Sequence, residues 1–281
     1  MKLEDSRSIF DEDIKFEEIL FISDTECFTK EIKKYLLDRI KNEKYKLIVF
    51  IGDILSFLEK DEEAFSLLPN STHIMEIICN YDIGEELKYD YSRSHVGGKI
   101  SEYISKKYKD YLNNFFSFVN RCEKKGVGII FYSGNHDSML SNRNSYFDKE
   151  VVPILNKINS LNNFYIPYDF ELIKLNKDLY LLGAHTDNNS YNSKDYSYLR
   201  DFTQSNKVIE DTNKIIFLSH LPGTLKFKDA GSTDIINFKK KFKFKYHFHG
   251  HCRDYNGEYI EEETPTRSVH HKDEIHYSKV K

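Results

Sequence analysis

The chain has 281 residues, a formal net charge of −4, 5 prolines and no tryptophan. Its length suits a single domain with insertions, because domains commonly run to about 250 residues. Its net charge does not indicate binding to nucleic acid or to an anionic membrane surface.

The cysteines and the first residues indicate a reducing, cytoplasmic setting. The cysteines lie far apart and form no CxxC pair, which argues against a zinc knuckle; they are Cys27, Cys79, Cys122 and Cys252. A long chain with so few cysteines is typical of a reducing compartment. Residues 1–18 are charged and lack the apolar segment of a signal peptide. The sequence has no run of about 18 apolar residues, so we expect no membrane-spanning helix.

Apolar patterns in the N-terminal half predict strands alternating with helices. Short apolar runs predict buried strands at 18–23, 47–51 and 127–132, and helical spacing predicts helices at 30–41 and 100–122. The longer helix carries one apolar stripe, made of Ile100, Ile104, Tyr108, Leu112, Phe115, Val119 and Cys122. Strand–helix–strand order is typical of a parallel βαβ unit.

The stretch between the second strand and the long helix is less regular. Residues 55–98 are polar in patches, so we interpret them as part of an insertion. We therefore expect a single domain over 1–281, with a mainly helical insertion at about 57–120.

The C-terminal half continues the alternation of strands and helices. The pattern predicts a hairpin around Asn176-Lys177, with strands at 170–175 and 179–183. The further predicted elements are a helix at 191–213, a strand at 215–218, a short helix at 233–240, a strand at 244–248 and two short strands after Asn256.

Five of the predicted strands end in a polar side chain: Asp24, Asp53, Asn135, His220 and His251. In α/β sheets, ligands bind outside the carboxyl ends of the strands, so these side chains are expected to converge. Carboxylate, amide oxygen and imidazole together suit a divalent ion such as Mn, Fe or Zn. A Gly-Asp turn or a lone histidine also occurs in ordinary loops, so the G-N-H-D run at 134–137 is the more specific part of the pattern.

The ordered series D-x-E, G-D, G-N-H-D, S-H and G-H runs from Asp24 to Arg253. This series resembles the calcineurin-like metallophosphoesterase superfamily, whose motifs run D-x-H, G-D-x-x-D, G-N-H-[DE], a lone H, and G-H-x-H. The resemblance implies an α/β fold in which a two-sheet β-sandwich is flanked by α-helices. It also implies two metal ions at the strand ends.

The resemblance implies a role for each site residue. Asp53 would bridge the two metals and Asp24 would belong to one site, while the other site would be completed by Asn135, His220 and His251. His136 would contact the phosphate and protonate the leaving group, with Asp137 orienting it. The implied reaction is metal-dependent hydrolysis of a phosphomonoester or phosphodiester by a metal-activated water, with Mn or Fe as the expected metal and Zn as a further candidate.

Two departures from the family pattern fall on the same metal site. Glu26 stands where the family has a histidine, and Arg253 stands where it has the second histidine of G-H-x-H. Glu26 either ligates a metal, with Arg253 contacting phosphate, or pairs with Arg253 so that the chain holds one metal instead of two. A third reading is a scaffold or binding module without activity. A smaller departure is Ser56, in place of the last Asp of G-D-x-x-D.

A basic, aromatic segment supports one further alternative. The lysines from Lys239 to Lys245 alternate in part with aromatic residues, which is expected of a manganese-dependent nuclease or, more simply, of a strand with one solvated face. His249, His185 and Asp187 also lie near predicted strand ends, and for these we weigh metal or cleft roles against packing. Superfamily membership leaves the substrate class open, and nothing in the sequence indicates an oligomeric state.

Overall fold

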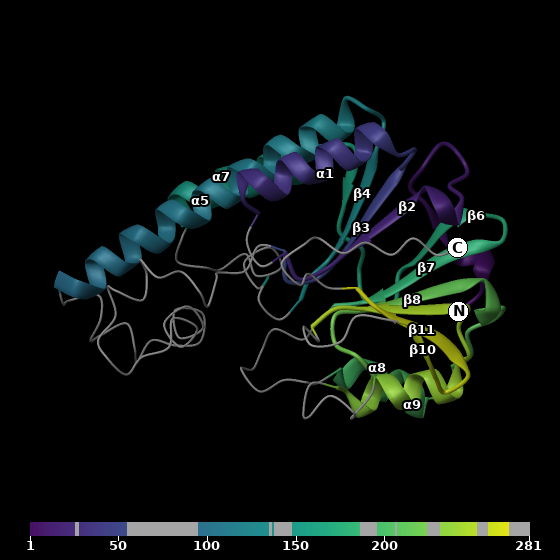
Figure 1. The fold of residues 1–281 in the computed structure, drawn as a ribbon. Coiled ribbons are helices and arrows are strands. Elements are labelled where there is room, and N and C mark those ends of the chain that lie inside the picture. The colour runs from purple at the N-terminus through teal and green to yellow at the C-terminus, as the bar shows by residue number, and fades with distance from the viewer. Residues whose placement is uncertain are drawn as a thin grey trace.

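The computed structural model describes residues 1–25, 28–54, 95–134, 137, 148–185, 196–205, 207–223, 231–251 and 258–269. Within them, the strands form a four-stranded and a seven-stranded sheet that pack face to face, with helices on the outer face of each sheet (Figure 1). This arrangement confirms the predicted two-sheet sandwich flanked by α-helices. None of the described helices is long and apolar enough to cross a membrane.

The four-stranded sheet is entirely parallel. Its order is β2 (Ile19–Ile22), β3 (Leu47–Ile51), β4 (Gly128–Tyr132) and β5 (Phe164–Tyr165). Every residue of β2, β3 and β4 is buried, because one face of the sheet is covered by helices and the other by the second sheet. Such double burial explains why these strands read as uninterrupted apolar runs.

Three helices cover the outer face of this sheet: α1 (Lys30–Asn42), α5 (His95–Glu123) and α7 (Asp148–Asn159). Thr29 begins α1, since its side chain accepts a hydrogen bond from the amide of Ile32. The C-terminal part of α5 presents Leu112, Phe115 and Val119 to the core, as the apolar stripe predicts. Figure 1 shows the N-terminal end of α5 extending beyond the sheet. Residues 55–94 of the predicted insertion lie outside the described residues.

The seven-stranded sheet is mixed. Its members are β1 (Arg7–Ser8), β6 (Leu172–Asn176), β7 (Leu179–Ala184), β8 (Ile215–Ser219), β9 (Tyr246–His249), β10 (Glu258–Glu261) and β11 (Thr264–Ser268), in the order β1-β6-β7-β8-β9-β11-β10. β7, β8 and β9 are parallel, whereas β6–β7 and β10–β11 are antiparallel hairpins. The outer face is covered by α8 (Ser197–Gln204) and α9 (Thr233–Lys241). Short 3₁₀ helices are η1 (Leu3–Asp5), η2 (Phe16–Glu18) and η3 (Thr212–Lys214).

The core between the sheets follows the alternation of side chains along each strand. In β2, Ile19 and Phe21 face the second sheet, while Leu20 and Ile22 pack under the helices. Phe21 stacks on Phe248 of β9, with ring centroids 4.3 Å apart. The two sheets are therefore joined through large apolar side chains near the middle of their strands.

Several boundaries differ from those predicted, and α5 for example begins at His95 instead of Ile100. The helix predicted at 191–213 is wrong beyond Gln204, because α8 ends there. The Ser205 hydroxyl accepts a hydrogen bond from the amide of Lys207, a local bond that competes with helix continuation. The predicted strand at 244–248 begins later, at Tyr246. The helix α7 is not predicted from the sequence, and it contains Pro153, a residue that normally argues against a helix interior.

Phe21→Ala should lower the free energy of unfolding by about 3–5 kcal/mol, because it removes a fully buried ring from the contact between the sheets. The matched control is Tyr168→Ala, which truncates a ring that is 77% exposed and should change stability by less than about 0.5 kcal/mol. Equilibrium urea unfolding measures both values. Equal effects of the two variants would contradict the described inter-sheet core.

Candidate metal centre

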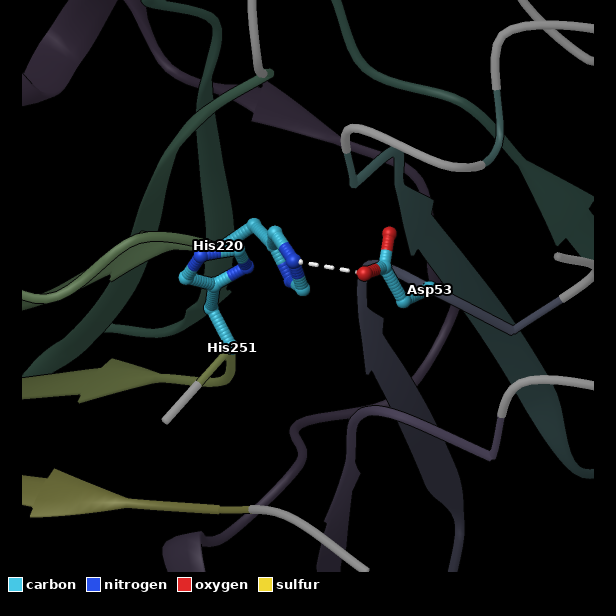
Figure 2. Close-up of side chains that lie close together, drawn as sticks. All are labelled: Asp53, His220 and His251. Atoms are coloured by element: carbon cyan, nitrogen blue, oxygen red, sulfur yellow. Dashed lines mark ion pairs between the residues drawn. The ribbon is translucent and has the colours of Figure 1, made fainter. Parts of the chain in front are cut away.

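The predicted site residues that the structure describes lie where the carboxyl ends of the two sheets meet. Asp53 follows β3 in the four-stranded sheet, while His220 follows β8 and His251 follows β9 in the seven-stranded sheet. Each of these three side chains offers one ligand atom, and the three atoms lie within 4.8 Å of one another (Figure 2). Residues from three separate motifs, and from both sheets, are thus brought together.

Glycines in the motifs allow this close approach. A Cβ atom at Gly134 would lie 2.2 Å from Asp53 Oδ1, and one at Gly52 would lie 2.5 Å from His220 Nδ1. A Cβ atom at Gly250 would lie 2.3 Å from an oxygen of Asp24. All three distances are shorter than a van der Waals contact, so each motif needs glycine beside its polar residue.

The backbone turns sharply where the strands end. Asp24, Asp53 and His251 have φ angles of 53°, 52° and 66°, in the left-handed region. Asp and His adopt this region more readily than most residues do. Such backbone conformations often occur at functional sites, where the surrounding structure holds them in place.

The ring of His220 is oriented by the backbone. Its Nδ1 lies 3.0 Å from the carbonyl oxygen of Ile51, so Nδ1–H donates to that oxygen. Its Nε2 then faces Asp53 Oδ2 at 3.0 Å, and both groups are buried (Figure 2). A histidine whose Nδ1–H is held by a carbonyl and whose Nε2 faces a carboxylate is arranged as metal-ligating histidines are.

The charges around His220 favour a cation. Burial of the ring lowers the pKa of His220, but the carboxylates of Asp53 and Asp24 outweigh this effect and raise the pKa to about 10. Burial raises the pKa of Asp24 to about 6, against the effect of His220 and with a further contribution from Asp53. A positive charge at Nε2 is therefore stabilised by two buried carboxyl groups.

Asp24 lies beside the group of three and contacts the backbone. Both of its carboxylate oxygens accept from the amide of His251, at 3.1 and 2.9 Å, and Ser23 donates its hydroxyl to Oδ2. Asp24 thus links the end of β2 to the end of β9 and holds His251 in place. The role of Ser23 was missed in the sequence, where a serine before an aspartate gives no distinct signal.

Asp137 is buried and joins two of the motifs. Its Oδ1 accepts from the amide of Ile54 and its Oδ2 accepts from the amide of Gly134, both at 2.9 Å. This carboxylate therefore ties the turn after β3 to the turn after β4. Its predicted action on His136 stays a prediction, because His136 lies outside the described residues.

The other predicted site residues outside the described part of the chain are Glu26, Asn135 and Arg253, together with Asp187.

Two further histidines near the strand ends have backbone partners. His185 Nδ1 accepts from the amide of Ser133 at 3.0 Å, and its Nε2 donates to the carbonyl of Pro167 at 2.7 Å. His185 therefore links β7 to the residues that follow β4. Nδ1 of His249, a buried residue, lies 2.9 Å from the carbonyl of Gly250. These contacts support a packing role for both rings.

The lysines of the basic segment have nearby partners. Lys243 pairs with Glu263, and Lys240 lies 3.7 Å from Glu262. Lys241 donates to the carbonyls of Thr203 and Ser205. Lys239 is fully buried. Much of the positive charge that the sequence indicates is therefore compensated by the acidic turn between β10 and β11.

The comparison with known protein families agrees with this geometry. A family model described as calcineurin-like phosphoesterase matches residues 18–252, a range that includes Asp24, Asp53, His220 and His251. No curated protein matches the chain. Among solved structures, the chain is similar to the crystal structure of TT1561 of Thermus thermophilus, with 10% sequence identity and a TM-score of 0.45 over 90% of this chain and 88% of that one.

Gly134→Ala should displace Asp53, because the added methyl group would overlap its carboxylate. We expect Mn²⁺ affinity to fall by at least about tenfold. The control is Gly126→Ala, where φ is +68° and nothing lies within 4 Å of the new methyl group. That variant should lose about 1 kcal/mol of stability and keep its metal affinity. Competition with a chelating dye measures affinity, and equal affinities in both variants would argue against the steric role of Gly134.

Proposed function

Since the chain belongs to the calcineurin-like phosphoesterase family, we propose that it is a metal-dependent hydrolase of a phosphomonoester or phosphodiester. The observation that carries this proposal is the convergence of Asp53, His220 and His251 where the two sheets meet. A carboxylate and two imidazoles suit Mn, Fe or Zn, and we favour Mn or Fe.

The residues fit such a metal. The buried Nε2 of His220 faces a carboxylate oxygen of Asp53 at 3.0 Å. Without a metal, a proton on this nitrogen forms an ion pair with Asp53, and a divalent metal would take the place of that proton. A bound divalent metal would supply Lewis-acid polarisation of the phosphoryl group and lower the pKa of a bound water.

The chain itself supplies orientation and proton transfer. The Ile51 carbonyl holds the His220 ring, and Asp24 holds the backbone of His251, so the ligand atoms are fixed before a substrate arrives. Asn135 is the proposed additional ligand, and His136 is the proposed acid that protonates the leaving oxygen. Asp137 braces the turn that carries both residues, through the amide of Gly134.

The number of metals depends on the second site. We propose that Asp53, His220 and His251 form the first site, with Asn135. Asp24 and Glu26 would form the second site if a second ion binds, with Arg253 near the phosphate. If Glu26 and Arg253 instead pair with each other, one metal per chain is expected. Metal analysis of the purified protein, beside a Glu26→His, Arg253→His double variant, separates these two cases.

A scaffold module and a nuclease are the alternative functions. A scaffold would bind its partner equally well after Asp53→Asn and would show no turnover with any metal. A nuclease would need positive charge to follow a nucleic acid backbone. The pairing of Lys240 and Lys243 with acidic residues does not favour that reading. The cytoplasmic location stays a prediction, and the substrate class and the oligomeric state are left open by the sequence.

Turnover of an aryl phosphate and of a diaryl phosphodiester, with Mn, Fe, Zn and Mg in turn, tests the proposal. We expect activity with at least one metal and a loss of about a thousandfold in kcat for Asp53→Asn, because that change removes a charged ligand. The matched control is Asp178→Asn, an exposed aspartate that pairs with Lys214 and should keep full activity. Absence of turnover with all four metals, in a protein that binds them, would support the scaffold instead.

Metal binding should release a proton at pH 7.5. His220, with its pKa raised to about 10, carries a proton on Nε2 at this pH, and coordination by Nε2 requires that proton to leave. Affinity should therefore rise with pH between about 6 and 9, and it should fall more steeply below about pH 6, where Asp24 also takes up a proton. Calorimetric titration with Mn²⁺ in two buffers of different ionisation enthalpy measures the released protons. A release near zero would contradict metal binding that displaces a proton from Nε2 of His220.

A further inference from the structure

A fully buried lysine lies behind the metal centre. Lys239 of α9 is 0% exposed, and its Nζ lies 2.7 Å from Glu261 Oε2, 2.7 Å from Thr266 Oγ1 and 3.2 Å from His247 Nδ1. His247 is also buried, and its Nε2 lies 2.8 Å from the hydroxyl of Ser219. These side chains form a connected polar chain from α9 to the strand end that carries His220.

The hydrogens of this chain follow from what each group can donate. An ammonium has three hydrogens and no acceptor, and Lys239 has three acceptors around it. Thr266 donates its own hydroxyl to the carbonyl of Thr264, which leaves its oxygen to accept from Lys239. Nδ1 of His247 must then accept, so the proton of this neutral ring is on Nε2.

The series of hydrogen bonds from Lys239 through His247 ends on the two residues that flank His220. Nε2–H of His247 donates to the oxygen of Ser219, whose hydroxyl donates to the carbonyl of Leu221 at 2.7 Å. Ser219 and Leu221 are the two neighbours of His220. The backbone of this segment has two more contacts, from the amide of Leu221 to the hydroxyl of Tyr196 and from the amide of Gly250 to the carbonyl of His220.

We propose that Lys239 is a positioning residue for the metal ligand His220, acting through His247 and Ser219. This inference rests on the proposed metal-binding role of His220. Lys239 acts by selecting the Nε2–H tautomer of His247, which in turn fixes the direction of the Ser219 hydroxyl and the turn from Ser219 to Leu221. The His220 ring then meets Asp53 at the distance that coordination needs.

A buried lysine is costly to desolvate, and an apolar residue of similar length would serve packing alone. A simpler role would be to tie α9 to the β10–β11 hairpin through Glu261 and Thr266. The two roles differ in which hydrogen bond matters. The positioning role depends on the contact with His247, whereas the tie depends on the contacts with the hairpin.

The variants to compare are Lys239→Met, Ser219→Ala and their combination. Lys239→Met removes the donor to His247, and Ser219→Ala removes the hydroxyl that links His247 to the backbone beside His220. We expect each single variant to lower Mn²⁺ affinity by about tenfold. The double variant should show no further loss, because both changes interrupt the same series of hydrogen bonds. Lys240→Met is the matched control, since it alters a half-exposed lysine one position away. Glu261→Gln weakens the tie to the hairpin but leaves the contact with His247, and it should keep near wild-type affinity.

Nitrogen-15 NMR of selectively labelled histidines provides a readout that needs no metal. In the wild type we expect His247 in the Nε2–H form, and a Nδ1–H signal of His220 protected from exchange by the Ile51 carbonyl. Lys239→Met and Ser219→Ala should both increase exchange of the His220 proton, and Lys240→Met should not.

The inference is overturned if Lys239→Met lowers the melting temperature but leaves both metal affinity and the His220 signal unchanged. It is also overturned if the effects of Lys239→Met and Ser219→Ala simply add. If Lys239→Met does not fold, Ser219→Ala alone decides, by the same two measurements. A wild-type protein that binds no metal would refute the proposed function, while the His220 signal would still decide whether Lys239 positions that ring.

Discussion

The contact between Asp53 and His220 is the point on which the site depends. Asp53 belongs to one sheet and His220 to the other, and their charged atoms lie 3.0 Å apart in a buried position. The apolar core between the sheets is held by an attraction that has no preferred direction, so it does not by itself define how the strand ends meet. Polar contacts at the edge supply that direction. Asp24 links the sheets in the same way, through the amide of His251.

Placing several polar groups in a buried edge is costly unless each has a partner. The structure meets this requirement largely with backbone groups. The carboxylates of Asp24 and Asp137 accept from amides, and the ring of His220 donates to a carbonyl. Since backbone groups move less than long side chains do, the ligand atoms are fixed by the fold. The glycines beside them make room for this arrangement. A side chain at Gly52 or Gly250 would collide with a residue of the opposite sheet, and one at Gly134 would collide with Asp53.

Much of the fold and of the site follows from local patterns in the sequence. Apolar runs that end in Asp24, Asp53, His220 and His251 predict both the strands and the edge at which these residues meet, because parallel strands place their carboxyl ends together. The resemblance predicts the sandwich, which the structure confirms. Asp53, His220 and His251 lie close together, and their binding of a metal stays a prediction. The predicted roles of Glu26, Asn135, His136 and Arg253 stay predictions.

Other features depend on contacts between distant segments, and local patterns do not reveal them. The carboxylate of Asp137, for example, accepts from the amide of Ile54, which belongs to a different motif. The lysines at 239–241 look alike in the sequence. Which of them is buried depends on how α9 is rotated about its axis where it packs on the sheet. Ile235 and Phe238 form the apolar face of α9, and Lys239 lies beside it, where it contacts Glu261 and Thr266.

The helix α9 both packs on the sheet through its apolar face and holds the ammonium of Lys239 in position. The apolar face of α9 packs on the seven-stranded sheet and would do so with any residue of suitable size at position 239. A lysine there needs three acceptors in defined positions, and these come from β9, β10 and β11. Apolar packing changes little in energy when a helix slides by a small distance. A buried ammonium with three fixed acceptors would lose hydrogen bonds on the same movement. The lysine therefore restricts α9 and the strand ends to one arrangement, and that arrangement is the one in which His220 faces Asp53.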